Sequence, residues 1–240
     1  WAPQGFFRFW SVEKIPMNGL TPSSPGIQAI PVDESHEPLV DITESSGLGV
    51  GPPPECPETE PDYCWVRQGV RDRLIQAQAL LPDGIYLRLY EGYRSPAVQQ
   101  MLFANHLAQV KQDQPDLGEQ QAYLEATQLV SAPTRPDGTD NIPPHSTGAA
   151  VDVELVDEGG TVLDFGMEIA DWGRVPLALC ERDCAGLSER AQHNRQHLLD
   201  VMQHVGFVNY PQEWWHFSYG DQFWAYTAGQ PSAIYGRVDR

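Results

Sequence analysis

The chain of 240 residues is long enough for one large domain or two small ones. Its content of 41% hydrophobic and 20% charged residues is typical of a globular protein and excludes a disordered or fibrous one. Lys and Arg number 15 against 33 Asp and Glu, a formal net charge of -18. We expect no nucleic-acid partner, because so acidic a field repels phosphate backbones. We also expect no membrane span, because no run approaches the roughly 18 apolar residues required.

Residues 1–65 differ in composition from the rest and predict an extended N-terminal arm, followed by a domain over 66–240. The arm is rich in Pro and Gly and lacks helical periodicity, with an edge strand predicted at 39–42. Its many aromatic residues, starting with Trp1, indicate that it packs on the domain. No signal peptide is visible near Trp1, which favours the cytoplasm; a signal already removed would leave the same sequence, so export stays open.

Helices and strands are mixed along the rest of the chain, without a regular βαβ rhythm. In chain order the patterns predict a helix at 70–81, a strand at 85–90, a helix opened by Pro96, a Gln-rich helix at 117–130, a loop at 131–144, a strand at 151–156, a helix capped by Ser188 and closed by Gly206, and a hairpin of 207–210 and 214–219. The mixture predicts an α+β fold with a mostly antiparallel central sheet flanked by helices.

Four cysteines, Cys56, Cys64, Cys180 and Cys184, lack the CxxC spacing of zinc ribbons and redox motifs. They could form two local disulfides, which would indicate an exported protein, or remain four thiols. The sequence leaves both alternatives open.

Several common catalytic motifs are missing. There is no GxSxG elbow, Walker loop, GxGxxG or HExxH sequence. His193 and His197 have helical i, i+4 spacing, but Asn194 stands where HExxH has its Glu. Because their face lies opposite the apolar residues Leu198 and Met202, we expect it to face solvent rather than to bind metal.

Two segments have a composition suited to a catalytic site. In HSTGAAVD (145–152), a His follows a proline-rich loop and Asp152 lies within an apolar strand, where a buried carboxylate needs a partner. In EWWH (213–216), an acid and a His lie among aromatic residues, which exclude water and strengthen local charge interactions. Taken singly, each segment also fits a structural role, as a structural Asp beside a loop His or as a core strand with a hydrogen-bonded His.

Together the two segments supply a complete metal site. His145, Asp152 and His216 offer two imidazole nitrogens and a carboxylate, the three-ligand shell of a catalytic zinc with one open position, and we expect one Zn2+ per chain. Glu213 lies three residues before a ligand, where it can act as general base. Arg94, at a strand-to-helix turn, could stabilise an oxyanion. A surface Arg at a helix start is the alternative for that position.

Three motifs carry a family resemblance, namely EGYRSP (91–96), HSTGAAVD (145–152) and EWWH (213–216). With these motifs in this order, the sequence over about 66–228 resembles the zinc D-alanyl-D-alanine dipeptidases of the VanX type. The resemblance implies a small α+β unit with zinc at the centre of an antiparallel sheet. It gives His145, Asp152 and His216 the role of zinc ligands, Glu213 that of catalytic base, and Arg94 that of stabilising the transition state.

The resemblance also implies a substrate-binding acid some twenty residues beyond Asp152, which would hold the free ammonium of the substrate. Asp171 is our candidate and Glu168 the second choice, because the region is offset by about one position. Trp214 is also predicted to bind substrate. The family often has small hydroxyl residues before the first His, where this chain has two prolines at 143 and 144.

We therefore predict hydrolysis of D-alanyl-D-alanine or a similar small D,D-dipeptide in cell-wall peptide metabolism. One alternative is a D,D-carboxypeptidase that acts on longer muropeptides. Another is a non-catalytic zinc-containing domain that binds cell-wall fragments, although the intact Glu213 weighs against it. The sequence does not distinguish dipeptide recycling from glycopeptide resistance, and it leaves the oligomeric state open.

Overall fold

The structure is a computed structural model that describes residues 20–240 except 46, 53, 55, 56 and 136. Residues 1–19, with the aromatic residues that we expect to pack on the domain, lie outside the described part of the chain, as does Cys56.

The central sheet runs through the middle of the molecule and has five strands. In spatial order these are β2 (Gly49–Val50), β4 (Ile85–Glu91), β5 (Ala150–Asp157), β7 (His216–Ser218) and β6 (Val208–Asn209). β2 pairs with β4 in parallel, and the other three pairs are antiparallel. The predicted α+β fold with a mostly antiparallel sheet is therefore confirmed, and β6 and β7 form the predicted C-terminal hairpin.

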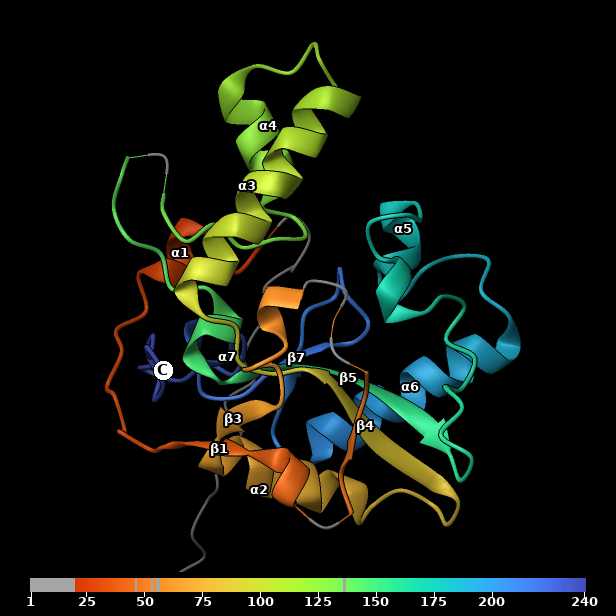
Figure 1. The fold of residues 1–240 in the computed structure, drawn as a ribbon. Helices are drawn as coiled ribbons and strands as arrows, with labels where there is room; N and C mark the ends of the chain where they lie inside the picture. Colours follow the sequence, from red (N-terminus) through yellow and green to blue (C-terminus); the bar gives the residue numbers. More distant parts are fainter. Residues whose placement is uncertain (1–19, 46, 53, 55–56, 136) are drawn as a thin grey trace, which may run out of the picture.

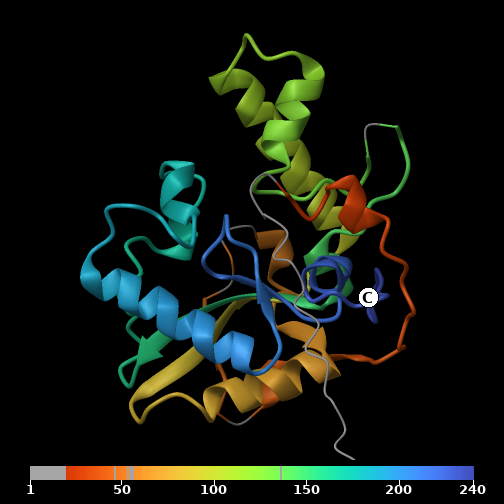
Figure 2. The same ribbon diagram turned by 180° about the vertical axis from the view of Figure 1, so that it is seen from behind.

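The helices of the described residues surround this sheet (Figures 1 and 2). The α-helices are α1 (Pro25–Gln28), α2 (Gln68–Gln78), α3 (Pro96–Asp113), α4 (Glu119–Ala126), α5 (Leu177–Cys180), α6 (Glu189–His204) and α7 (Gln222–Thr227), and the short 3-10 helices are η1 (Ile42–Glu44), η2 (Pro57–Thr59), η3 (Pro144–Thr147) and η4 (Ile169–Asp171). The four predicted helices correspond to α2, α3, α4 and α6. Ser188 caps α6 by accepting a hydrogen bond from the Ala191 amide, and Gly206 has the positive φ of 93° that follows the helix.

One face of the sheet is covered by α2 and α6, which lie side by side (Figure 2). Alternate residues of β5 point to this face, where they join one apolar core with both helices; its members include Val151, Val153, Leu155, Val70, Leu74, Leu198 and Met202. Complete burial of such an aliphatic side chain contributes about 1.5–3 kcal/mol. The intervening residues of β5, Asp152 and Glu154, therefore point to the opposite face.

α3 and α4 form a separate hairpin that projects away from the sheet (Figure 1). The two helices share a small apolar cluster that contains Phe103, Val110, Ala122 and Ala126. This cluster is distinct from the main core, so the hairpin depends mostly on contacts between its own two helices.

The described part of the predicted arm is built into the fold at three places. β2 extends the central sheet, β1 (Leu39–Asp41) pairs with β3 (Trp65–Arg67), and α1 contacts α7. The domain boundary predicted at residue 65 falls within β3. Arg67, 3% exposed, holds several segments together by donating to the carbonyls of Glu37, Thr147 and Gly236.

The described cysteines are free thiols. Cys64 and Cys180 are buried and Cys184 is partly exposed, so the alternative of a local disulfide between Cys180 and Cys184 does not hold in this structure. Burial raises the pKa of Cys64 to about 11 and that of Cys180 to about 12, which keeps both side chains protonated.

Candidate active site

The centre of the candidate site is a row of three side chains on adjacent strands. Asp152 on β5 pairs with His216 on β7 and with Glu91 on β4. Side chains at directly paired positions lie about 4.5–5.5 Å apart at Cβ. The β4–β5 register shifts between Leu89 and Glu91, and an irregularity of this kind turns a side chain to the other face. The sheet thus places two acids and one histidine on the face opposite α2 and α6.

His145 reaches this row from η3, which immediately precedes β5. The helix ends at Gly148, whose φ of 68° is the left-handed conformation that favours glycine. An added Cβ at Gly148 would also lie 2.3 Å from the Leu39 side chain, so both the backbone conformation and this contact favour glycine. The His145 Nδ1 lies 2.8 Å from the Gly92 carbonyl. With Nδ1 as the donor, the lone pair of Nε2 faces Asp152.

The three predicted metal ligands converge. The Asp152 Oδ1 lies 3.4 Å from the His145 Nε2 and 3.0 Å from the His216 Nδ1, and ligand atoms of all three side chains lie within 4.8 Å of one another. Among the described residues, no other group of three or more potential metal ligands is as close together. His193 is exposed as expected, whereas His197 is partly buried. Burial alone would raise the pKa of Asp152, but the two neighbouring histidines outweigh it and hold that pKa well below its usual value.

Glu213 lies beside the three ligands, in the turn between β6 and β7. Its Oε2 is 3.6 Å from the His216 Nδ1, and its side chain is buried. Burial, together with the nearby charge of Asp152, raises the pKa of Glu213 well above its ordinary value. Asn209 fixes this turn, because its amide donates to the carbonyls of residues 213, 214 and 216.

Arg94 follows β4 and is held by two side chains. Its Nε donates to Glu91 at 2.8 Å, its Nη2 makes a second bond to Glu91, and its Nη1 donates to the Gln99 Oε1 at 3.0 Å. Gln99 in turn donates to the Ser131 carbonyl. Burial alone would lower the pKa of Arg94, but the charge and hydrogen bonds of Glu91 raise it, so the guanidinium stays charged. These bonds use three of its five N–H donors and leave two for a ligand.

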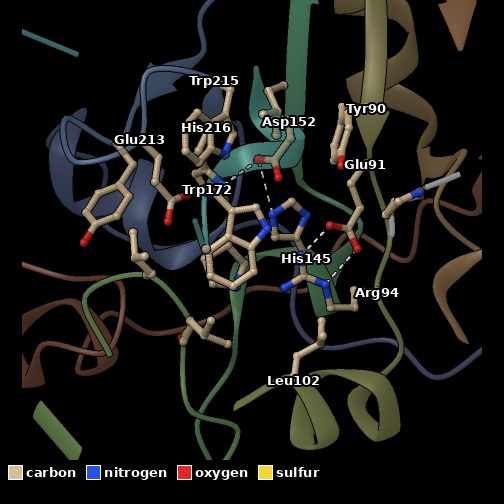
Figure 3. A pocket seen from close by; sticks show the side chains of 18 of the residues that line it. Tyr90, Glu91, Arg94, Leu102, His145, Asp152, Trp172, Glu213, Trp215 and His216 are labelled. Atoms are coloured by element: carbon tan, nitrogen blue, oxygen red, sulfur yellow. Dashed lines mark hydrogen bonds and ion pairs between the residues drawn. The ribbon is translucent and has the colours of Figure 1, made fainter. Parts of the chain in front are cut away.

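All five predicted metal and catalytic residues line one cavity of about 430 Å³ (Figure 3). The opposite wall comes from α3, the segment after α4 and the η4 loop, and it includes Leu102, Asn105, Gln128, Leu129 and Trp172. The volume lies within the range of small-molecule sites, and the lining has the usual combination of apolar walls and a few polar groups.

The two predicted substrate-binding residues do not line this cavity. Trp214 is 2% exposed and stacks on Phe165 with ring centroids 4.2 Å apart; the next residue, Trp215, lines the cavity instead. Adjacent side chains point in opposite directions, and the EWWH sequence alone does not reveal which indole faces inward. Asp171 lies between the lining residues Ala170 and Trp172, but its partly exposed carboxylate is 3.7 Å from Arg174. Its role as ammonium anchor stays a prediction.

Sequence reasoning missed several residues of the site. Glu91 could have been found, because an acid three residues before a buried Arg is a plausible partner for it. Asn209, Gln99 and Trp172 gave no such signal, because their positions depend on how separate elements pack together.

A scan against family models matches residues 59–232 to Peptidase_M15, described as D-ala-D-ala dipeptidase. A curated relative from Synechocystis sp., a D-alanyl-D-alanine dipeptidase, is 33% identical over 91% of this chain and 98% of its own length. The chain belongs to this dipeptidase family. An Escherichia coli D-alanyl-D-alanine dipeptidase is 38% identical over 30% of this chain and 36% of its own length. The family resemblance of the sequence motifs is thereby confirmed.

Two solved structures match this chain with lower sequence identity. VanYB in complex with D-alanine-D-alanine is 21% identical, with a TM-score of 0.42 over 69% of this chain and 79% of that one. The LdcB LD-carboxypeptidase is 18% identical, with a TM-score of 0.41 over 78% of this chain and 71% of that one. Separately, none of the helices in the described part of the chain combines the length and apolar character needed to cross a bilayer.

Proposed function

We propose that this cavity hydrolyses D-alanyl-D-alanine or a similar small D,D-dipeptide in cell-wall peptide metabolism. The observation that carries the proposal is the convergence of His145, Asp152 and His216 beside a buried Glu213 in a single cavity. Membership of the dipeptidase family and the full-length relative from Synechocystis support the choice of substrate.

The three converging residues fit a zinc ion. Two imidazole nitrogens and one carboxylate oxygen are typical zinc donors, and three protein ligands leave a fourth position for water or substrate. The Asp152 Oδ1 faces the His145 Nε2 and the His216 Nδ1. A metal ion bound between these three atoms would take the place of the protons that otherwise bridge the carboxylate and the imidazoles. When bound, zinc would lower the pKa of a water molecule to about 7 and polarise the substrate carbonyl. We expect one such ion per chain.

Glu213 would move the proton in this reaction. Its carboxylate lies beside the His216 Nδ1 without being one of the three ligands, so it can accept a proton from the attacking water. Its burial favours the protonated form that results. The same proton can then pass to the nitrogen of the departing amino acid, so that the carboxylate is restored at the end of the cycle.

Arg94 would stabilise the oxyanion that develops on the scissile carbonyl. Glu91 and Gln99 hold its guanidinium in place before substrate arrives, and its two remaining N–H groups are available to the substrate. Loss of a single preorganised donor of this kind costs about 2.7–4 kcal/mol in other enzymes.

The test is release of D-alanine from D-alanyl-D-alanine by the purified protein, with metal analysis of the same sample. We expect zinc at one equivalent per chain and turnover that a chelator abolishes and added zinc restores. A parallel assay with an N-acylated pentapeptide ending in D-Ala-D-Ala separates the dipeptidase from a carboxypeptidase. Hydrolysis of the pentapeptide alone would contradict the proposed substrate, and zinc binding without hydrolysis of either would indicate a binding domain.

A further inference from the structure

His216 has a second ring nitrogen that has no partner. Its Nδ1 faces Asp152 and Glu213, whereas its Nε2 is buried and makes no hydrogen bond to the described residues. If Nδ1 gives its lone pair to a metal, Nε2 must carry the proton. A buried donor without an acceptor is destabilising, so this N–H needs a partner. The other ligand histidine already has one, the Gly92 carbonyl.

Two further orphaned polar atoms follow His216 in the chain. Ser218 is two residues along β7 and therefore points to the same side of the strand as His216. Its buried hydroxyl has no close hydrogen-bond partner among the described residues. Asp221 is 2% exposed; its Oδ1 accepts from the Trp224 amide at 2.7 Å, while its buried Oδ2 has no partner. Burial is the largest cause of its raised pKa, and Ser218 and His216 are among the groups that oppose it. The charges of the Asp221 carboxylate and His216 therefore interact.

The backbone fixes Asp221 in this position. Gly220 has a φ of 90°, and an added Cβ there would lie 2.4 Å from the Tyr235 ring. Its carbonyl accepts from the amides of Ile234 and Tyr235. The chain therefore turns sharply after β7. Asp221 caps the N-terminus of α7 with one carboxylate oxygen, and its other oxygen has no partner among the described residues.

We propose that Asp221 is a positioning residue for the metal ligand His216. Its Oδ2 accepts the Nε2–H of His216 through a buried water that also binds the Ser218 hydroxyl. This hydrogen bond fixes the tautomer that leaves Nδ1 free to bind metal, and it holds the ring in its plane. The inference rests on the metal site of the proposed function but not on the identity of the substrate.

The test compares the zinc affinity of Asp221→Asn with that of the unaltered protein, by competition with a chromophoric chelator. Asn keeps an oxygen for the helix cap but loses the charge, so α7 should persist. We expect the affinity to fall about 10- to 100-fold, as is usual when such an outer partner is removed. Asp41→Asn is the matched control, because Asp41 caps η1 with the same type of bond. An affinity for zinc equal to that of the control would overturn the proposal.

A second readout is the 15N NMR spectrum of the histidine rings in the zinc-loaded protein. We expect His216 to carry its proton on Nε2, protected from exchange with water, and this signal to shift in Ser218→Ala, which also serves if Asp221→Asn does not fold. A proton on Nδ1, or an Nε2–H signal unchanged in Ser218→Ala, would contradict the proposal. Both readouts are independent of turnover. The proposed dipeptidase activity can therefore fail while this inference stands, and this inference can fail while the dipeptidase activity stands.

Discussion

The two walls of the cavity are held in place by different forces. On one wall, Asp152, His216 and Glu91 lie on paired strands, so backbone hydrogen bonds determine their spacing. On the other wall, Leu102 and Trp172 come from elements that meet mainly through side-chain packing. The reacting groups therefore lie on strands whose spacing is set by backbone pairing. The shape of the cavity, in contrast, depends on side-chain contacts that can change with little effect on the sheet. We therefore expect substitutions on the sheet wall to affect turnover and those on the helix wall to affect substrate choice.

The largest effect is expected from Glu213→Gln on the sheet wall. Gln keeps the size and polarity of the side chain but cannot accept the proton of the attacking water, so kcat should fall about 10²- to 10⁴-fold. Because Glu213 is not one of the three ligands, the zinc content should stay stoichiometric. Metal analysis and D-alanine release check both points.

The matched control is Glu154→Gln, which alters another buried carboxylate, on β5, that bonds to Arg88 rather than facing the cavity. It should leave kcat nearly unchanged. Loss of zinc from Glu213→Gln would show that Glu213 is itself a ligand.

A smaller loss is expected from Arg94→Lys. Lysine keeps the charge but cannot reproduce the paired bonds to Glu91 together with the bond to Gln99, so the donor to the oxyanion would be displaced. We expect kcat to fall about 10²- to 10³-fold while zinc stays bound. Arg88→Lys on the same strand is the control, since Arg88 pairs with Glu154 outside the cavity. Equal losses in the two variants would mean that Arg94 is only structural.

The sequence predicted the sheet wall better than the helix wall, and the reason is physical. The alternation of β5 placed Asp152 on the face opposite its apolar neighbours Val151 and Val153, and the HSTGAAVD and EWWH motifs each contain their reacting groups within a few positions of each other. Trp172 has no comparable local signal, because the contact it makes joins segments 66 positions apart in the chain. The prediction for Trp214 met a related difficulty, because strand alternation gives two opposite faces without saying which one is the cavity; in the structure Trp215 lines the cavity and Trp214 does not.

On the helix wall, we expect Trp172→Ala to change the length of peptide that the cavity accepts. The Trp172 ring meets His106 of α3 edge to face, with centroids 5.8 Å apart, and it packs against both the main core and the α3–α4 cluster. It thus links the η4 loop to α3, and it is one of the labelled residues that line the cavity in Figure 3. Loss of such an aromatic contact costs about 0.5–1.5 kcal/mol and would let the two elements separate.

The readout for Trp172→Ala is the ratio of kcat/KM for D-alanyl-D-alanine to that for an N-acylated tripeptide ending in D-Ala-D-Ala. We expect this ratio to fall severalfold, about the change that a contact of this size supports. Trp224→Ala is the control, because that indole donates to the Gly206 carbonyl away from the cavity. An unchanged ratio in Trp172→Ala would show that this ring does not limit substrate length.

The smallest effect is expected from Asp171→Asn at the rim of the helix wall. The side chains of Asp171 and Arg174 are 45% and 66% exposed, so solvent screens the charge that would attract the substrate ammonium. An exposed ion pair is worth about 0–1 kcal/mol, which limits the expected rise in KM for D-alanyl-D-alanine to about fivefold, with kcat unchanged. An N-acylated substrate has no ammonium and should show no change, and added salt should reduce the difference between the two substrates. Asp183→Asn, which removes the acid of another exposed Arg–Asp pair, is the control. Equal losses for both substrates would exclude Asp171 as the ammonium anchor.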